Sequence, residues 1–138
     1  MEIKRLAIIS IAVRNLEQSV ANWERTLGLR PDVRFHDEHE KLDIARFYLG
    51  GTALELIQPT ADNAVSRFLE RRGEGVFVLV FEVDDVRRAM AELREKGVPL
   101  VEDSPVEGME GSYFNIHPRA MNGVLVQLWS GQLLAPAK

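Results

Sequence analysis

The chain contains no cysteine, and this absence removes several classes of site at once. It excludes disulfide bonds, thiolate metal sites and a cysteine nucleophile. An excess of positive charge is missing as well, because 17 basic residues stand against 21 acidic ones and the formal charge is −4. This balance argues against nucleic acid as a partner and against a polybasic membrane anchor.

Long hydrophobic runs are also absent. The longest apolar stretches cover residues 6–13, interrupted only by Ser10, and residues 76–81, whereas a membrane-spanning helix needs about 20 apolar residues. The N-terminal residues imitate a signal peptide only in part, because the apolar segment is short and no small-residue cleavage site follows it. We therefore expect a buried strand here, a cytoplasmic protein, and no membrane among its partners.

The remaining composition is ordinary for a globular protein. The 138 residues are 46% apolar and 28% charged, which suits one domain with a core of its own. An internal repeat organises this length. A β-rich run at residues 8–13 recurs at residues 78–83, 70 positions later (78 − 8), and a helical pattern follows each run.

The two helical patterns have matching ends. Asn15 is the expected N-cap of the first helix and Asp84 or Asp85 that of the second, and Gly28 and Gly97 end them. Apolar residues recur at helical spacing in both; they are Leu16, Val20, Trp23 and Leu27 in the first, and Val86, Ala89, Met90 and Leu93 in the second.

Strand pairs complete each copy of the repeat. Residues 46–58 predict a hairpin around Gly50-Gly51, because two glycines suit a tight turn. Residues 112–129 are its counterpart, with a longer loop at residues 117–122. Each copy is therefore a strand, a helix and further strands.

The chain thus divides into two modules within one predicted domain. They cover about residues 5–59 and 76–130, and a connector at residues 60–75 links them. Asp62 or Asn63 is the expected N-cap of a short helix in the connector. Two copies of this size are too few for a solenoid and indicate a duplicated module.

Three segments carry a resemblance to a known family. IISIAVRNLEQSVANWERTLGL (residues 8–29) resembles the opening strand and helix of the vicinal oxygen chelate superfamily, which includes glyoxalases, bleomycin resistance proteins and dioxygenases. Residues 66–103 and HPRAMNGVLVQL (residues 117–128) are similar to the methylmalonyl-CoA epimerase branch. The resemblance implies an α+β fold of two βαβββ modules forming a curved mixed sheet around a cavity, usually in a homodimer.

The resemblance also implies a divalent metal held by one side chain from each of four strands. At the matching positions this chain has Ile8 and Val78, where the family has histidines, and Glu55 and Gln127, where it has acidic or amide ligands. One carboxylate and one neutral amide are too few to hold a divalent ion in an apolar cavity. We therefore expect no metal and no cofactor, and Ile8 and Val78 become candidate ligand-lining residues.

Glu55 and Arg46 present two alternatives. A two-residue turn at Gly50-Gly51 pairs Arg46 with Glu55 on one face of the hairpin. If the two side chains pair, Glu55 serves the structure or orients Arg46 to bind an anionic ligand. If they do not, apolar neighbours raise the pKa of Glu55 and make it a candidate base. Asp43 is a further acid, but its strand parity differs from that of Arg46.

Further candidate ligand-binding residues lie in the second module. Gln127 is a candidate catalytic residue that orients a carbonyl or stabilises an enolate but exchanges no proton. Tyr113 and Trp129 either pack in the core or line a pocket for an aromatic or acyl group. His117 either caps the turn before Pro118 or touches a ligand.

Two polar clusters have ordinary interpretations. His36 and His39 stand in Phe-His-Asp-Glu-His-Glu, which we interpret as a charged loop and not as a metal site. The basic group Arg67, Arg71 and Arg72 either meets a phosphate of coenzyme A or forms a solvated helix face balanced by nearby glutamates, and we favour the second.

The sequence thus leaves four functions open. The first is a metal-independent protein that binds a small carbonyl or acyl-thioester ligand and performs proton transfer, isomerisation or lyase chemistry, with Glu55 as base. The second is a non-catalytic protein that sequesters a small molecule, in the manner of bleomycin resistance proteins. The third is a metal-dependent epimerase, and the fourth is a non-catalytic interaction partner. A homodimer is expected.

Overall fold

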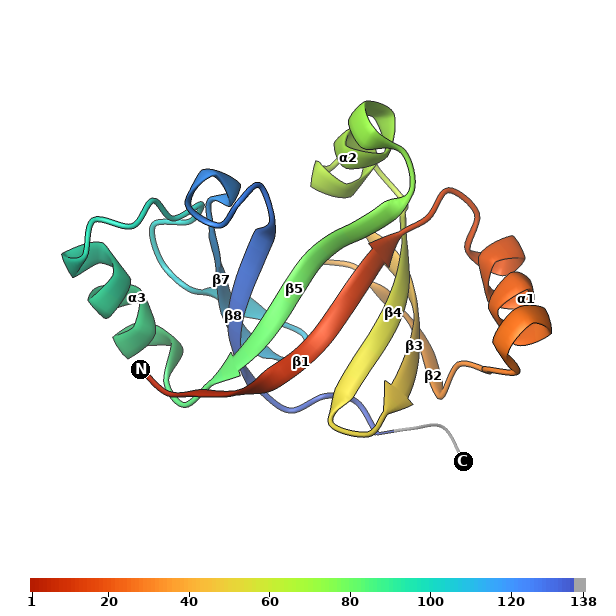
Figure 1. Ribbon diagram of the computed structural model, residues 1–138, viewed down its shortest axis with the longest axis horizontal. Coiled ribbons are helices and arrows are strands. Elements are labelled where there is room, and N and C mark those ends of the chain that lie inside the picture. The colour runs from red at the N-terminus through yellow and green to blue at the C-terminus, as the bar shows by residue number, and fades with distance from the viewer. Residues whose placement is uncertain (136–138) are drawn as a thin grey trace. The chain divides into compact units, whose positions relative to one another are not determined.

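The computed structural model describes residues 1–135, and Figure 1 shows the arrangement of its elements. Within these residues the α+β prediction is confirmed. In chain order the elements are β1 (Ile3–Ala12), α1 (Leu16–Leu27), β2 (Val33–Asp37), β3 (Leu42–Leu49), β4 (Thr52–Pro59), α2 (Ala64–Arg72), β5 (Gly75–Val83), α3 (Val86–Glu95), β6 (Val106–Gly108), β7 (Gly111–Ile116), the 3-10 helix η1 (Pro118–Ala120) and β8 (Leu125–Gly131).

The chain forms two compact units. The C-terminal unit contains residues 1–8 and 78–133, with strand order β1-β5-β8-β7-β6. The N-terminal unit contains residues 9–77 and the segment from Leu134, with strand order β2-β3-β4-β1-β5. β1 and β5 therefore contribute one part to each unit. The sheet is mixed, because β5 and β8 run parallel whereas β3 and β4, like β7 and β8, run antiparallel.

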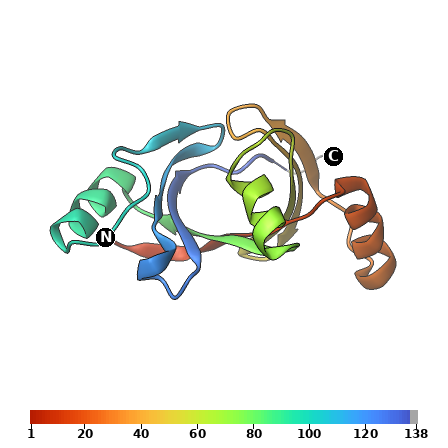
Figure 2. The ribbon, with the colours of Figure 1, turned by 90° about the horizontal axis from the view of Figure 1, so that it is seen from above.

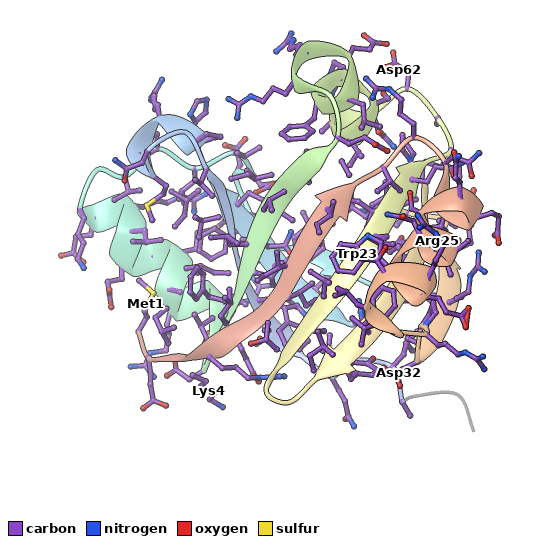
Figure 3. All side chains as sticks on the ribbon, turned by 45° about the vertical axis from the view of Figure 1, so that its right-hand side comes forward. Met1, Lys4, Trp23, Arg25, Asp32 and Asp62 are labelled. Carbon is purple, nitrogen blue, oxygen red and sulfur yellow. The ribbon has the colours of Figure 1, made fainter. Side chains whose placement is uncertain are left out.

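In the N-terminal unit, α1 and α2 cover opposite faces of the strands, as the view from above shows (Figure 2). The side chain of Asn15 accepts from the backbone N–H of Gln18 and caps α1. Gly28 ends the helix at φ 71°, a left-handed conformation that a residue without Cβ adopts easily. Trp23 projects from α1 onto Phe47 of β3, with ring centroids 6.1 Å apart (Figure 3).

The connector helix α2 has a full capping box. Asn63 accepts from the backbone N–H of Ser66, and Ser66 Oγ accepts from the backbone N–H of Asn63. Of the two expected caps, the structure therefore uses Asn63. Val65 and Leu69 of α2 pack on one end of the strand face, which they share with the buried residues Ala12, Leu42, Ile44 and Ile57.

The C-terminal unit is built around α3. Asp85 caps this helix, and all four of its expected apolar residues are buried. They pack on one face of β5, β7 and β8, whose buried residues there are Val83, Phe114, Ile116, Val126 and Leu128. Because side chains alternate along a strand, Asn115, Gln127 and Trp129 belong to the opposite face.

The hairpin prediction is confirmed residue by residue. β3 and β4 turn at Gly50-Gly51, and Arg46 lies opposite Glu55. Two expectations are wrong. The segment of His36, expected as a charged loop, contributes residues 33–37 to strand β2, which pairs with β3. Leu27, expected on the apolar face of α1, is 61% exposed because it lies in the last turn, beyond the strands.

No helix in the described part of the chain is long and apolar enough to cross a membrane. That the sheet surrounds a cavity stays a prediction, and so does the assignment of the whole chain to one domain.

The fold predicts a contrast between two identical substitutions. Leu56→Ala should lower the free energy of unfolding by about 3–5 kcal/mol, because the side chain is fully buried and its removal leaves a cavity. The matched control, Leu27→Ala, should change it by less than about 0.5 kcal/mol. Urea denaturation monitored by circular dichroism measures both. Similar losses in the two variants would contradict the assigned core.

Candidate functional site

One face of the N-terminal unit carries both apolar and polar side chains. Alternation places Ile44, Arg46 and Tyr48 of β3 on this face, together with Glu55 and Ile57 of β4. The apolar end is covered by α2. The other end contains the arginine and the glutamate, each buried to more than nine-tenths.

Arg46, Glu55 and Ser10 form a hydrogen-bonded cluster. Glu55 Oε2 accepts from Arg46 Nε at 3.0 Å and lies 2.9 Å from Arg46 Nη2. Glu55 Oε1 accepts from Ser10 Oγ at 2.7 Å. Each carboxylate oxygen thus has a partner within the unit. Of the two alternatives, the structure contains the paired arrangement.

Neighbouring groups complete the surroundings of Arg46. Its guanidinium carbon lies 5.1 Å from the centroid of the Phe35 ring, in cation–π geometry. Nη1 donates to the Tyr48 hydroxyl at 3.4 Å, and that hydroxyl donates to the carbonyl of Leu134. Side chains of β2, β3 and β4 therefore hold the guanidinium in one orientation, and Ser10 of β1 holds Glu55.

Gln127 belongs to a separate group of hydrogen-bonded polar side chains in the C-terminal unit. Its Nε2 donates to Asn115 Oδ1 at 3.3 Å across the β7–β8 pair. Asn115 Nδ2 donates to Glu102 Oε2 at 2.8 Å, and the Asn115 backbone N–H donates to Glu102 Oε1 at 2.7 Å. Tyr113 and Trp129 occupy the next positions of the same face, and they lie opposite each other.

The other expected residues lie as follows. Ile8 and Val78 are buried, each 6% exposed, on β1 and β5 of the C-terminal unit. Trp129 is buried and donates from Nε1 to the carbonyl of Glu110 at 3.3 Å. His117 is exposed, and its Nδ1 accepts from the backbone N–H of Arg119 at 3.1 Å, so it caps η1. Asp43 lies on the strand face away from Arg46, as its parity predicts.

The residues that the resemblance places at the four metal positions do not fit a divalent cation. Ile8 and Val78 offer no donor atom. A cation beside Glu55 would meet the guanidinium of Arg46, and Nε2 of Gln127 is a hydrogen-bond donor. Within residues 1–135, no group of three or more His, Cys, Asp or Glu side chains is arranged to hold a metal ion. These four positions therefore lack the set of oxygen and nitrogen ligand atoms that a metal site requires.

His36 has a structural role on β2. Its Nδ1 lies 2.8 Å from Asp43 Oδ1 and its Nε2 lies 2.7 Å from Glu38 Oε2. The hydrogen bonds to Asp43 and then Glu38 raise the pKa of His36 above its ordinary value, since both favour the protonated ring. Both ring nitrogens of His36 contact carboxylates, so neither is directed at His39, and the two histidines do not form a metal-binding pair.

Sequence reasoning missed the residues that orient the candidate side chains. Ser10 was visible as the one polar residue in an apolar run, and Asn115 as a polar residue between two buried ones. Glu102 gave no signal, because it lies in an irregular charged segment. Tyr48 gave none either, because its partner Leu134 is 86 residues away.

Comparison with known families gives one match. The profile described as Glyoxalase/Bleomycin resistance protein/Dioxygenase superfamily matches residues 9–115. The matched segment includes β1 from Ile9, the β3–β4 hairpin and most of β7.

Individual relatives agree with this match. An uncharacterized protein of Bacillus subtilis, YqjC, is 36% identical over 126 residues, covering 90% of both chains. The ethylmalonyl-CoA/methylmalonyl-CoA epimerase of Cereibacter sphaeroides is 29% identical over 130 residues, covering 91% of this chain and 97% of the relative. A Streptomyces coelicolor methylmalonyl-CoA epimerase variant, solved with 2-nitronate-propionyl-CoA, superposes with a TM-score of 0.87 at 28% identity, covering 96% of this chain and all of the other.

The Arg46–Glu55 pair predicts a strong asymmetry between single and double variants. Arg46→Met should destabilise the fold by about 3–5 kcal/mol, because it leaves a buried carboxylate without its cation. Adding Glu55→Gln should restore much of that loss, since no buried charge then remains. Chemical denaturation of the three proteins measures the effect.

An exposed pair is the matched control. Glu17 accepts two hydrogen bonds from Arg34 at the surface, where solvent screens the charges. Arg34→Met should therefore have a much smaller effect than Arg46→Met. If Arg34→Met and Arg46→Met lowered the free energy of unfolding equally, burial would not explain the cost of breaking the Arg46–Glu55 pair.

His36 predicts a pH-dependent contribution to stability. Because its pKa is raised in the folded state, the contribution is complete below the unfolded pKa of about 6.5 and is lost as the pH rises through the folded value. The melting temperature of the protein minus that of His36→Gln should therefore fall between pH 6 and pH 9. His39→Gln is the control, because no described residue hydrogen-bonds to that side chain. A difference that stays constant with pH would contradict the His36 contacts.

Proposed function

Because this chain belongs to the glyoxalase/bleomycin resistance protein/dioxygenase superfamily, we propose that it binds a small carbonyl or acyl-thioester compound without a metal ion and moves a proton on that compound. The observation that carries this proposal is the buried Arg46–Glu55–Ser10 cluster. Glu55 stands at a position that, by the resemblance, supplies a metal ligand in the family, and here the guanidinium of Arg46 lies beside it.

The cluster supplies two chemical capacities. A guanidinium binds carboxylate or phosphate groups through several N–H donors, and Glu55 holds that of Arg46 in position. Glu55 is also the only acid at the four positions that the resemblance indicates. It is paired, so as the proposed base it must release Ser10 or Arg46 from one carboxylate oxygen to take a proton. Relatives named as epimerases of methylmalonyl-CoA and ethylmalonyl-CoA support an acyl thioester as the ligand.

The proposed step is proton transfer at the carbon beside a carbonyl group. Glu55 takes the proton as the C–H bond breaks, and the electron pair moves into the adjacent C–C bond while charge develops on the carbonyl oxygen. The protonated Glu55 carboxyl exchanges its proton with solvent water, and transfer of a proton from Glu55 back to the carbon closes the cycle.

A second function is favoured by one specific observation. Both carboxylate oxygens of Glu55 already have partners, namely Ser10 and Arg46. A protein that sequesters an anionic molecule and leaves it unchanged needs only the guanidinium and the apolar residues around it. A metal-dependent epimerase of the relatives' type is the third function, and the chelator arm of the experiment below distinguishes it. The proposed homodimer is measured by native mass spectrometry, which also reports any bound ion.

Deuterium exchange tests the proposed reaction. Incubated in D₂O with methylmalonyl-CoA and an excess of EDTA, the protein should introduce deuterium at C2 of the acyl group, as measured by mass spectrometry. Glu55→Gln should lower the rate by at least about 100-fold, since general-base catalysis contributes about 10²–10⁴. With one base, exchange should also be faster than inversion of configuration, because inversion needs acid–base groups on opposite faces of the carbon.

Each of the other outcomes would support a different function for this protein. Binding without exchange would support sequestration and contradict the proton transfer. Exchange that stops with EDTA and returns with a divalent ion would overturn metal independence. Glu107→Gln, which changes an exposed carboxylate, is the control for Glu55→Gln and should leave the rate unchanged.

A further inference from the structure

The orientation of the Gln127 side-chain amide follows from neighbouring groups that can act only as hydrogen-bond donors or only as acceptors. The backbone N–H of Asn115 can only donate, and it donates to Glu102 Oε1. Glu102 Oε2 can only accept, so the atom of Asn115 that lies 2.8 Å from it must be Nδ2. The amide oxygen of Asn115 is therefore turned toward β8, where Gln127 lies opposite in the strand register.

The same logic then fixes Gln127. Asn115 Oδ1 can only accept, so the group of Gln127 that meets it must be Nε2. Since N and O occupy opposite branches of the planar amide, Oε1 of Gln127 points away from Asn115. Within residues 1–135, no side chain or backbone group donates to this oxygen, and it is not among the fully buried atoms without a partner. It therefore remains accessible.

We propose that Glu102 is the positioning residue that, acting through Asn115, turns the carbonyl oxygen of Gln127 outward and excludes a carboxylate at position 127. Asn115 is only 9% exposed, so it has little room to move aside. A glutamate at position 127 would direct its oxygens at Asn115 Oδ1. Asn115 could rotate its amide only by directing the same oxygen at the carboxylate of Glu102.

This arrangement also assigns a ligand preference, in a step that rests on the proposed function. An outward carbonyl oxygen accepts hydrogen bonds, so Gln127 is suited to a hydroxyl or N–H group on the ligand. The oxyanion-stabilising role expected from the sequence would use an amide N–H, and one of the two is already committed to Asn115.

The direction of the hydrogen bonds that run from Gln127 through Asn115 to Glu102 can be reversed by exchanging the amide and the carboxylate between positions 127 and 102. In Glu102→Gln/Gln127→Glu, the amide introduced at position 102 would accept from the Asn115 backbone N–H through its oxygen and donate from its nitrogen to Asn115 Oδ1. Asn115 Nδ2 would then donate to the new carboxylate at position 127. Every donor again has an acceptor, although each side-chain bond now runs the opposite way.

Thermal unfolding of four proteins tests the proposal. Gln127→Glu should unfold about 5 °C below the parent, because it brings two acceptors together near a buried amide. Glu102→Gln/Gln127→Glu should recover most of this shift. Glu95→Gln/Gln127→Glu is the matched control, because it has the same net charge but changes an exposed glutamate without a described partner, and it should not recover the shift. If Gln127→Glu fails to fold, recovery of soluble protein replaces the melting temperature in the same comparison.

A spectroscopic readout separates positioning from simple loss of stability. In a ¹H–¹⁵N spectrum, Glu102→Gln should move the Asn115 side-chain amide proton upfield, since its acceptor is no longer a charged carboxylate. Equal melting temperatures for Gln127→Glu and the parent, or equal recovery in the two double variants, would overturn the proposal. These measurements need no ligand, so they stand even if the proposed function fails. An unchanged deuterium-exchange rate in Glu102→Gln would overturn the ligand preference alone.

Discussion

The ion pair between Arg46 and Glu55 is the constraint on which the polar face of the N-terminal unit depends. Both side chains are buried. The free-energy cost of removing their charges from water is offset only while the carboxylate keeps its two hydrogen-bond donors and the guanidinium keeps its acceptor. The register of the β3–β4 hairpin brings the two together, and the Gly50-Gly51 turn sets that register. A local feature of the backbone thus determines the electrostatics of the candidate site.

Much of the fold was predictable because it depends on local rules. The turn at Gly50-Gly51 fixed the pairing of β3 with β4, and Asn15, Asn63 and Asp85 cap helices as side chains of their kind commonly do. The repeat located both strand–helix units. Strand β2 escaped prediction although Val33 and Phe35 alternate with Arg34 and His36, because this alternation covers only a few residues and leads into a charged segment.

The candidate site was predictable only in part. Glu55 and Arg46 could be paired from the hairpin, and Gln127 could be placed by resemblance. Their orienting partners could not, because Ser10 lies 45 residues from Glu55 and Glu102 lies 13 residues from Asn115 in an irregular segment. Periodicity describes which side chains share a face, whereas a hydrogen bond depends on atoms that only the folded chain brings within reach.

The division of β1 between the two units has a consequence for how the protein forms. Residues 1–8 belong with residues 78–133, and they are held there by contacts of Met1 with Glu92, Glu2 with Asp84 and Arg5 with Glu82. The ribosome makes this segment before its partners, which emerge only after the part of the N-terminal unit at residues 9–77 has been synthesised. The C-terminal unit therefore cannot be completed early in synthesis, and its first strand must wait for partners that follow it by 77 to 91 positions.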